Sequence, residues 1–596
     1  MKHLNHQDTA VHASRRRFVK GLTTAGALSS LGGFGLLASQ TAYGGVGGEI
    51  PVLEGPNFEL TIAEMPANFT GTPRIATAIN GSIPAPILRM REGDDITIRV
   101  TNNMKVTSSI HWHGLILPAN MDGVPGLSFA GIRPGETYVY QFKAIQSGTY
   151  WYHSHSGYQE QTGMYGSIVI EPRNADPVRY DREHVVLLSD WSDERPEAIY
   201  AKLKKLSHYY NTRERTLGDF AKEVGQKGLG QAVSDRQMWN QMRMSDRDIS
   251  DVTGWTYTFL TNGQTPNQGW EGIFKPGERV RLRFINAAAM TFFDVRIPGL
   301  KMEVVATDGQ NIRPVKGIDE FRIGVAETYD VIVQPGAGAY TIFSQAIDRS
   351  GYARGTLTSQ AGQRAAVPAL DAMPTLTHGD MGMGSMGTGG DMAGMDHSNM
   401  GGDMAGMDHS KMGHDMAGMD HSMSTASGSV PVEMGPHIDM LAPDPQVRLD
   451  DPGVGLRNNG RRVLTYADIR NLTPTIDKRP PSREIELHMT GNMSRYMWSF
   501  NGVKFADAKP IGLRFGERVR ITLINDTMMN HPVHLHGMWS ELESGDNNYL
   551  PRKHTIVVQP GAKISYLVTA DAKGQWAYHC HLIYHMEGMF RRVVVA

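Results

Sequence analysis

The chain has 596 residues, more than one hydrophobic core usually serves, so several domains are expected. Its 59 basic and 61 acidic residues nearly balance, and this gives no basic excess that would indicate nucleic-acid binding. A single cysteine, Cys580, excludes an intrachain disulfide, and no apolar run reaches the ~20 residues of a membrane span.

The N-terminal segment has the pattern of an export signal. The stretch SRRRFVK precedes a weakly apolar run, rich in Ala, Gly and Leu, that ends near ASQTAYGG. The paired Arg15 and Arg16, followed by Phe18 and Lys20, resemble the twin-arginine signal of proteins that are exported folded. The alternative is a basic N-terminal tail. We expect residues 1–44 to be a twin-arginine signal peptide, read by the Tat export machinery.

Three stretches share one pattern and predict three similar domains. They read INGSIPAPILRMREGDDITIRVTNNM, TNGQTPNQGWEGIFKPGERVRLRFINAAAM and FNGVKFADAKPIGLRFGERVRITLINDTMM. Each has an Asn-Gly turn, a spacer, a Gly followed by an acidic residue, and an alternating strand that ends at Asn. Helical periodicity is confined to a polar insertion near Ala198. Many short strands with Gly and Pro turns are typical of β-sandwiches, so we expect an all-β chain with three such domains, at residues 45–175, 176–365 and 431–596.

The first and third domains carry histidine pairs that the middle domain lacks. HWHG and HLHG begin nine residues after Asn102 and Asn525, and HSH and HCH follow later in the same domains. The middle domain has apolar residues or FSQ at the matching places. One histidine alone is usually a satisfied core or surface residue, but four His-x-His pairs at equivalent places indicate a shared task. The eight histidines are His111, His113, His153, His155, His534, His536, His579 and His581.

The spacing of these histidines predicts a metal cluster. Residues i and i+2 of a strand share a face, so each pair aims two imidazoles at one place. Eight imidazoles without carboxylate favour copper over magnesium or calcium, and one structural zinc uses only four ligands. Cys580 would point away from its neighbours His579 and His581 and bind a further copper with His531 and His585, as in a His2Cys electron-transfer site. The alternative for this thiol is a small buried hydrophobe.

HWHG, HSH, HPVHLHG and HCHLIYHMEGM resemble, in type and order, the four copper-binding motifs of multicopper oxidases of the laccase type. The resemblance covers the chain from about residue 50 to the end, except the linker between the second and third domains. It implies three cupredoxin-like Greek-key β-sandwich domains and four copper ions: one type 1, one type 2 and two type 3. It assigns type 1 to His531, Cys580 and His585, type 2 to His111 and His534, and type 3 to His113, His153, His155, His536, His579 and His581.

Two more residues follow from this resemblance. The family's axial ligand of the type 1 copper lies five residues after the last His of the motif, where this chain has Phe590; Met589 lies at four. We expect Met589 to be the axial ligand of a loop one residue shorter; otherwise the site lacks a thioether. Asp122, in ANMDGVPG, matches the carboxylate that assists protons to the cluster, and an Asx turn before Gly123 is compatible with that role. Asp122 and Cys580 are thus the expected catalytic residues.

Residues 366–430 are expected to be a flexible linker. Within them, residues 381–423 hold twelve of the 34 Met, in repeats such as GDMAGMDHSNM and GDMAGMDHSKM with a period of twelve. Few aromatic or β-branched residues occur there, so the segment cannot bury enough surface to fold. A plain tether does not need methionine, whereas thioethers prefer Cu(I) and nearby His and Asp hold Cu(II). We therefore expect the repeat to bind additional copper; the alternative is a tether.

The export signal, the oxidase motifs and the repeat together resemble the periplasmic copper-resistance oxidases of Gram-negative bacteria. The resemblance implies oxidation of Cu(I), with phenols as a second class of reductant, and four-electron reduction of dioxygen to water. Expected partners are Cu(I) or small reductants, dioxygen and other periplasmic copper-resistance proteins, with no nucleic acid and no membrane span in the mature chain. Two alternatives stay open: a general laccase acting on phenols, and a periplasmic copper-sequestering protein with a vestigial oxidase centre.

Overall fold

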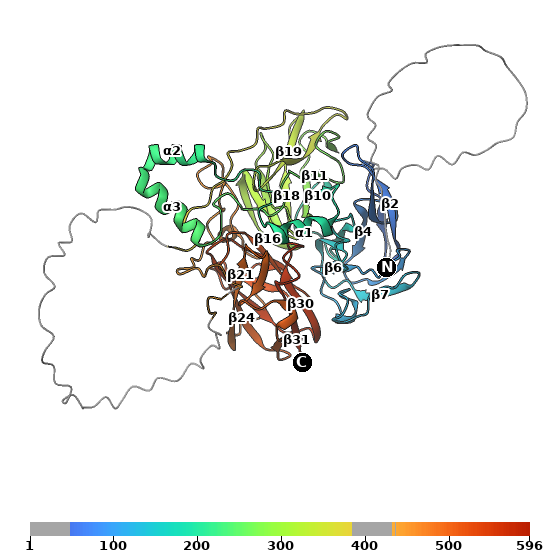
Figure 1. Cartoon of the computed structure of the whole chain (residues 1–596). Helices are drawn as coiled ribbons and strands as arrows, with labels where there is room; N and C mark the ends of the chain where they lie inside the picture. Colours follow the sequence, from blue (N-terminus) through green and yellow to red (C-terminus); the bar gives the residue numbers. More distant parts are fainter. Residues whose placement is uncertain (1–47, 384–431, 436) are drawn as a thin grey trace, which may run out of the picture. The chain divides into compact units, whose positions relative to one another are not determined.

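The computed structural model describes residues 48–383, 432–435 and 437–596 (Figure 1). The expected signal peptide and nearly all of the methionine-rich repeat lie outside the described residues. The described residues form six sheets, which fall in chain order into three pairs, and this confirms the predicted all-β class of three β-sandwiches. None of the helices in these ranges is long and apolar enough to cross a membrane.

The first sandwich, blue in Figure 1, packs a four-stranded sheet on a five-stranded one. The strand orders are β3-β2-β5-β7 and β1-β4-β9-β8-β6. Buried and exposed residues alternate along β2 and β5, because one face of their sheet lies on the core and the other meets solvent. The strands are β1 (Val52–Glu54), β2 (Asn57–Ala67), β3 (Arg74–Ile79), β4 (Ala85–Arg91), β5 (Asp95–Asn102), β6 (His111–His113), β7 (Thr137–Lys143), β8 (Gly148–His153) and β9 (Tyr165–Glu171).

The second sandwich, green to yellow in Figure 1, has a six-stranded and a five-stranded sheet. Their orders are β11-β10-β13-β18-β15-β16 and β12-β20-β19-β14-β17. Several of its strands are buried along their whole length, as β13 and β18 are, so this sandwich is covered on both faces. The strands are β10 (Arg182–Ser192), β11 (Tyr257–Thr261), β12 (Trp270–Ile273), β13 (Val280–Asn286), β14 (Phe293–Arg296), β15 (Met302–Thr307), β16 (Gln310–Ile318), β17 (Glu320–Ile323), β18 (Thr328–Val333), β19 (Ala339–Ala346) and β20 (Tyr352–Thr358).

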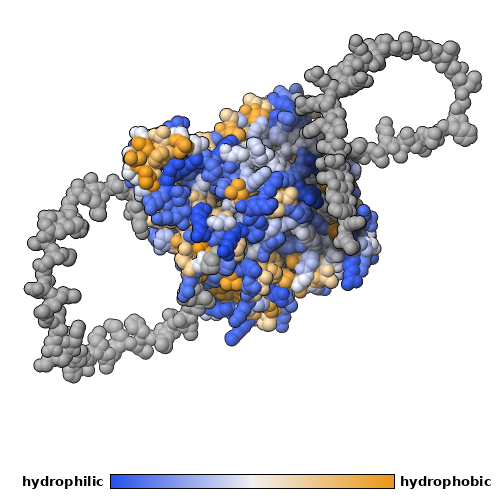
Figure 2. Space-filling model, in the orientation of Figure 1, coloured by the Kyte–Doolittle hydropathy of each residue, from blue (hydrophilic) through white to orange (hydrophobic). Residues whose placement is uncertain are grey.

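Three helices between β10 and β11 correspond to the polar insertion that the sequence predicts. Thr216 and Asp219 begin the second helix with a reciprocal capping box, in which each side chain accepts a backbone N–H of the other. An apolar patch over α2 and α3 is visible in Figure 2 and contains the exposed side chains of Leu217, Leu229 and Val233. The helices are α1 (Pro196–Lys205), α2 (Leu217–Lys227) and α3 (Leu229–Gln241).

The third sandwich, orange to red in Figure 1, repeats the sheets of the second with the orders β22-β21-β24-β29-β26-β27 and β23-β31-β30-β25-β28. In each sandwich the strand before the Asn-Gly turn (β3, β11 or β22) is antiparallel to the strand that precedes it, and that preceding strand pairs in parallel with the strand that ends at the repeated Asn. The strands are β21 (Arg483–Asn492), β22 (Met497–Phe500), β23 (Ile511–Leu513), β24 (Arg518–Asn525), β25 (His531–Leu535), β26 (Ser540–Leu542), β27 (Arg552–Lys553), β28 (Thr555–Val558), β29 (Lys563–Thr569), β30 (Gly574–Cys580) and β31 (Phe590–Val595).

The repeated Asn that ends the pattern holds the loop after its strand. In each sandwich this side chain is fully buried, its amide group donates to two backbone carbonyls, and its oxygen accepts a backbone N–H two residues ahead. These bonds satisfy a loop that would otherwise bury unpaired polar groups. The loop is thus anchored in the same way before β6, β14 and β25, and the residue nine places after the Asn (His111, Val295 or His534) lies on each of these strands. The three residues are Asn102, Asn286 and Asn525.

The first residues of the predicted linker pack on the sandwiches. Leu376 and Met381 are 3% and 0% exposed, and the Asp371 carboxylate lies 2.8 Å from an Arg296 guanidinium nitrogen. The chain is therefore anchored as far as residue 383, because buried apolar side chains and an ion pair hold it. The low aromatic content of the whole segment 366–430 concealed these few anchoring contacts, and the remainder lies outside the described residues.

Candidate metal centres

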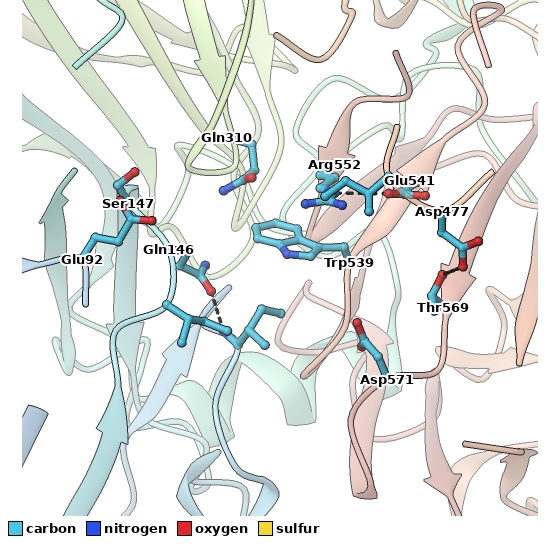
Figure 3. A pocket seen from close by; sticks show the side chains of 13 residues that line it. Glu92, Gln146, Ser147, Gln310, Asp477, Trp539, Glu541, Arg552, Thr569 and Asp571 are labelled. Carbon is cyan, nitrogen blue, oxygen red and sulfur yellow. Dashed lines mark hydrogen bonds and ion pairs between the residues drawn. The ribbon is translucent and has the colours of Figure 1, made fainter. Parts of the chain in front are cut away.

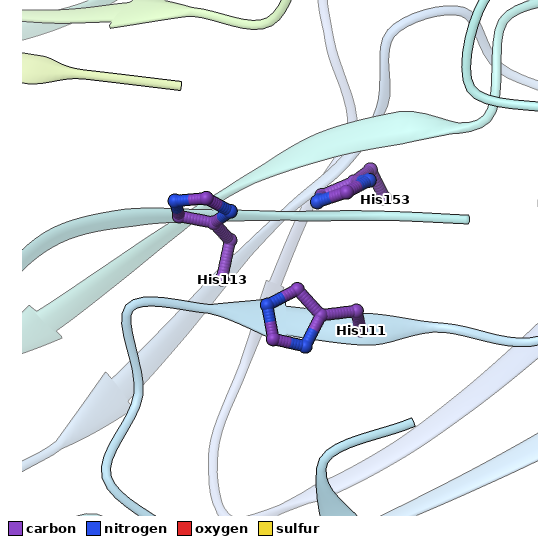
Figure 4. A group of neighbouring side chains, drawn as sticks. All are labelled: His111, His113 and His153. Carbon is purple, nitrogen blue, oxygen red and sulfur yellow. The ribbon is translucent and has the colours of Figure 1, made fainter. Parts of the chain in front are cut away.

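Three of the predicted histidines meet where β6 pairs with β8. In this antiparallel pair His111 lies opposite His153, and His113 lies opposite Trp151. The intervening Trp112 is 0% exposed and points into the core of the first sandwich, so the two histidines of HWH share the other face. Figure 4 shows the three imidazoles directed toward one another from the two strands.

The third sandwich presents its histidines in the same way. On β25 and β30, His534 lies opposite His579, and Val533 lies opposite Cys580. Alternation again places the two histidines of HCH on one face and the cysteine on the other. His536 lies just beyond β25, with its Nε2 3.1 Å from Nε2 of His579.

The two sets face each other across the first and third sandwiches. The rings of His111 and His536 stack with centroids 4.0 Å apart, and those of His113 and His534 with centroids 3.8 Å apart. His155 and His579 lie 5.1 Å apart by the same measure. All eight predicted imidazoles therefore converge. We call this group the histidine cluster: His111, His113, His153, His155, His534, His536, His579 and His581.

Backbone and carboxylate oxygens orient most of these rings through Nδ1. Nδ1 of His111 bonds the carbonyl oxygen of Asp122 at 2.7 Å, and Nδ1 of His536 bonds Oδ2 of the same residue at 2.8 Å. Nδ1 of His534 bonds the carbonyl of His554 at 2.6 Å, and Nδ1 of His579 bonds that of Cys580 at 3.0 Å. An Nδ1–H that donates leaves the lone pair on Nε2, which is then free to bind a metal.

Asp122 joins the two halves of the histidine cluster. It is 1% exposed and comes from the first sandwich, while its partner His536 comes from the third. The following Gly123 has φ +85°, and a Cβ there would lie 1.8 Å from the Ile110 carbonyl oxygen, so only glycine fits this close approach. Asp122 Oδ1 is buried without a hydrogen-bond partner among the described residues.

The free ring nitrogens fit a metal. Among the described residues, ring nitrogens of six cluster histidines are buried with no hydrogen-bond partner, which is costly unless a ligand satisfies them. Burial lowers the pKa of five of these imidazoles, and it lowers that of the neighbouring His579 to about 3, so these rings are neutral and carry lone pairs. The unpartnered atoms are Nε2 of His111, His153, His155 and His534, Nδ1 of His113, and both nitrogens of His581.

The second group, which we call the cysteine site, contains His531, Cys580 and His585. Sγ of Cys580 lies 3.5 Å from Nδ1 of His531 and 3.8 Å from Nδ1 of His585, and all three residues are 0% exposed. Burial raises the pKa of the Cys580 thiol, so a thiolate would form only with a cation bound. The opposite edges of the rings are held at Nε2, by Thr527 Oγ1 at 2.7 Å and Asp251 Oδ2 at 2.6 Å.

The two axial candidates are Phe590, the first residue of β31, and Met589, which directly precedes that strand. Phe590 pairs with His579, and its ring stacks on that imidazole with centroids 5.4 Å apart. Met589 precedes it, is 0% exposed, belongs to the same core cluster as Cys580, and accepts the Cys580 N–H at its carbonyl, 3.0 Å away. The chain thus places the methionine, and not the phenylalanine, on the side of the cysteine site.

Three buried residues next to these groups were not predicted. His554 lies against His113, Glu160 Oε2 lies 2.7 Å from Nδ1 of His153, and Asp251 contacts the cysteine site. None belongs to a repeat or to a motif with metal-ligand spacing; His554 and Asp251 come from loops far from their partners in sequence, whereas Glu160 follows His153 by seven residues. No signal in the sequence alone would have found them.

Of two cavities in these sandwiches, the first is lined by a residue of the histidine cluster and the second is not. One, of about 470 Å³, is lined by His155 itself together with apolar residues such as Val124 and Phe590. The other, of about 520 Å³, is reached from Gly114 through the side chain of Gln146, whose Nε2 donates to the Gly114 carbonyl at 2.8 Å. Figure 3 shows Trp539 in the middle of this second cavity, between Gln310 on one side and Arg552 with Glu541 on the other.

The chain matches known proteins over nearly its whole length. The family model described as multicopper oxidase matches residues 61–175, 182–362 and 478–596. The chain is 57% identical to copper resistance protein A of Escherichia coli, over 98% of this chain and 99% of that protein. It is also 57% identical to copper resistance protein A of Pseudomonas syringae pv. tomato, with the same coverage.

Solved structures show the same fold. The multicopper oxidase Fet3p, which functions in iron import, has a TM-score of 0.60 at 19% identity, over 91% of this chain and 90% of its own. The laccase from Botrytis aclada has a TM-score of 0.59 at 20% identity, over 92% and 88%. Such identities speak for the fold alone. Together with the family model, the relatives confirm the resemblance carried by the four motifs: the chain belongs to the multicopper oxidase family and is an oxidase.

Proposed function

We propose that the protein is a periplasmic copper-resistance oxidase that oxidises Cu(I) and reduces dioxygen to water. The observation that carries this proposal is the position of Cys580 on β30. Its sulfur belongs to the cysteine site, while its neighbour His579 on the same strand belongs to the histidine cluster. The relatives named copper resistance protein A support the physiological role. The bound coppers would supply one-electron uptake at the cysteine site and four-electron reduction of dioxygen at the histidine cluster.

The ligand assignments of the family are proposed for this chain residue by residue. Type 1 copper would be held by His531, Cys580 and His585, with Met589 as the axial ligand. Type 2 copper would be held by His111 and His534, and the type 3 pair by His113, His153, His155, His536, His579 and His581. The neutral, converging imidazoles and the buried ring nitrogens without partners support this set.

The backbone around Cys580 would link the two centres. His579 and His581 flank the cysteine on the other face of the strand, so one peptide unit separates the sulfur residue from each neighbouring imidazole residue. His579 Nδ1–H also donates to the Cys580 carbonyl at 3.0 Å, a second contact between the same two residues. Electrons would therefore cross from one site to the other without leaving the chain.

Asp122 would serve proton delivery to the histidine cluster. Its Oδ2 accepts from His536, whereas its Oδ1 is buried, lies 3.4 Å from Nδ1 of His111 and accepts no hydrogen bond among the described residues, so it can receive and pass a proton. The cavity lined by His155 is the route that we propose for dioxygen and water, because it brings solvent to a cluster imidazole.

The surroundings of His585 favour a small reductant over a phenol. This imidazole is 0% exposed, the Trp498 ring stacks on it at 3.9 Å, and Asp251 occupies its outer nitrogen. Tyr496, whose hydroxyl donates to the same carboxylate, closes the remaining side. A bulky aromatic substrate would have no direct contact with this ligand, whereas Cu(I) could give its electron through the Asp251 carboxylate.

The remaining proposals concern the segments around the sandwiches. Residues 1–44 would direct twin-arginine export, and residues 45–175, 176–365 and 431–596 would be the three cupredoxin domains. The Met-, His- and Asp-containing repeat of residues 381–423 would gather copper for the oxidase, because soft thioethers retain Cu(I). Other periplasmic copper-resistance proteins would be its partners.

Oxygen uptake by the full-length, copper-loaded protein tests this function. We expect turnover with Cu(I) to exceed turnover with a phenol at least ~10-fold, and Cys580→Ser to lose at least ~100-fold, since even outer partners of ligands contribute ~10–100-fold. A chain lacking residues 384–423, which leaves the buried Met381 in place, should keep oxygen uptake and lose copper tolerance.

Each rival gives a different result. Equal turnover of phenols would indicate a general laccase. Copper binding without oxygen uptake in the unmodified chain would indicate a sequestering protein with a vestigial centre. Unchanged copper tolerance after the deletion would reduce the repeat to a tether.

A further inference from the structure

His554 touches both halves of the histidine cluster, although it belongs to none of the motifs. Its side chain is buried, and its Nδ1 lies 3.1 Å from Nε2 of His113, with ring centroids 4.6 Å apart. Its backbone carbonyl accepts the Nδ1–H of His534 at 2.6 Å. One residue between β27 and β28 thereby orients a histidine of the first sandwich and a histidine of the third.

This contact reverses the ring of His113 relative to most other cluster imidazoles. His111, His534, His536 and His579 use Nδ1 for a hydrogen bond, and their Nε2 atoms face the cluster. His113 uses Nε2 toward His554, and its own Nδ1 is buried without a partner among the described residues. A donor N–H on Nε2 leaves the lone pair on Nδ1, so the neighbour selects which nitrogen is free.

The second sandwich holds His554 in place. Oδ2 of Asp308 accepts the backbone N–H of His554 at 3.1 Å and that of Thr555 at 3.2 Å. The ammonium of Lys553 lies 3.0 Å from Asp308 Oδ2 and 3.0 Å from Glu327 Oε1, and all three charged residues are at most 2% exposed. Two carboxylates around one buried cation make a fixed support, because moving any member would leave a buried charge unpaired.

We propose that His554 is a positioning residue that presents Nδ1 of His113 to copper, and that the metal-free second sandwich acts on the centre through it. The proposal rests on the proposed function, because it takes His113 as a ligand. A hydrogen bond to the far nitrogen of a metal-binding imidazole sets its tautomer and ring direction, and its loss weakens metal binding. The second sandwich thus contributes to the centre although it lacks histidine pairs of its own.

Copper content and absorption of the full-length protein test the proposal. His554→Phe keeps a ring and removes the nearer partner of His113 Nε2, leaving only Thr555 Oγ1 at 3.4 Å, and we expect it to lower the copper affinity of the histidine cluster ~10–100-fold. The visible absorption of the cysteine site should stay unchanged, which also reports that the variant folds. His554→Asn restores an acceptor close to the Nδ1 position and should keep the copper. His184→Phe is the matched control, since His184 bonds the Ile273 carbonyl and packs on Trp270 instead.

Gly114→Ala tests the same contact from the other side. A Cβ at this position would lie 2.4 Å from Cδ2 of His554 and would push the ring away from His113 while its chemistry is kept; because Gly114 has φ +80°, alanine also strains the backbone beside His113, so this variant supports the result of His554→Phe and does not replace it. We expect the same copper loss as in His554→Phe, read by metal analysis and by the near-ultraviolet absorption of the coupled copper pair.

Three outcomes would overturn the proposal. The first is a full copper load and an unchanged spectrum in both His554→Phe and Gly114→Ala. The second is equal loss in His554→Asn and His554→Phe, which would make His554 itself a ligand. The third is copper loss in His184→Phe as large as that in His554→Phe. Failure of the unmodified chain to bind copper at the histidine cluster would instead reject the proposed function.

Discussion

A shift of one residue along a strand changes which site a side chain enters. On β30, His579 points to the histidine cluster, and Cys580 points to the cysteine site. The same alternation governs the start of β31, where Phe590 stacks on His579 and Met589 faces the cysteine side. The face of the sheet to which each side chain points, and not the number of residues after the last His of the motif, therefore distinguishes Met589 from Phe590.

Met589→Leu and Phe590→Leu separate these candidates. We expect Met589→Leu to raise the reduction potential of the cysteine site and to shift its visible absorption, because the axial thioether tunes such sites. Phe590→Leu should leave both quantities unchanged, since its ring lies on the other face. Redox titration of the two copper-loaded variants measures this. If the reduction potential changes only in Phe590→Leu, the cysteine site has no axial thioether.

Strand β8 illustrates how an element carries function and stability together. Trp151 lies opposite His113, is 0% exposed, and stacks on His153 with centroids 4.3 Å apart. Its indole fills the space beside imidazoles that need a rigid wall to converge. The strand thus contributes a histidine of the cluster and the aromatic support of that histidine.

Trp151→Ala should destabilise the copper-free protein by about 3–5 kcal/mol, the usual cost of deleting a large buried ring. Trp255→Ala is the matched control: its indole is 68% exposed, and we expect a change within about 0.5 kcal/mol. Denaturant unfolding of both variants measures the difference. Equal effects of the two substitutions would show that Trp151 does not support the fold.

At the scale of the whole molecule, buried polar residues connect the three sandwiches. Thr149 of the first donates to Asp330 of the second at 3.0 Å, and Lys553 of the third is buried against Asp308 and Glu327 of the second. These side chains find their hydrogen-bond and ion-pair partners only when the sandwiches pack together. The stability of this packing therefore depends on the charge state of the buried groups, and so on pH.

His554 makes this coupling measurable in the copper-free protein. Burial lowers its pKa to about 4, whereas an unfolded imidazole has a pKa near ~6.5. Between these values the unfolded state binds more protons, so stability falls as pH falls. Relative to His554→Asn, the free energy of unfolding of the unmodified chain should fall by about 1.4 kcal/mol for each pH unit of acidification below ~6.5.

His488→Asn provides the control of opposite sign. Burial alone would lower the pKa of His488, but Asp526 and Glu486 raise it above the ordinary value. This imidazole therefore contributes stability at low pH that is lost as pH rises through its folded pKa. Urea unfolding at several pH values compares the two pairs. If the unfolding free energy changed with pH in the same way for His554→Asn and His488→Asn, each compared with the unmodified chain, the assignment of a neutral, buried His554 would be contradicted.

The amino-acid sequence by itself determined the fold class, the eight cluster histidines and the residues of the cysteine site. These rest on local regularities: Asn-Gly turns, the pleat of period two, and a constant interval after a buried Asn such as Asn102. A strand built from such a pattern must direct alternate side chains to one place, whatever surrounds it.

Only the tertiary structure decided what surrounds these ligands. His554 lies 441 residues from His113 in sequence, and Asp251 lies 334 residues from His585, yet each pair is in hydrogen-bond contact. No periodicity relates such residues, because loops of different sandwiches bring them together. The choice of free nitrogen on His113 and the closure over His585 follow from packing, and packing is a property of the folded chain as a whole.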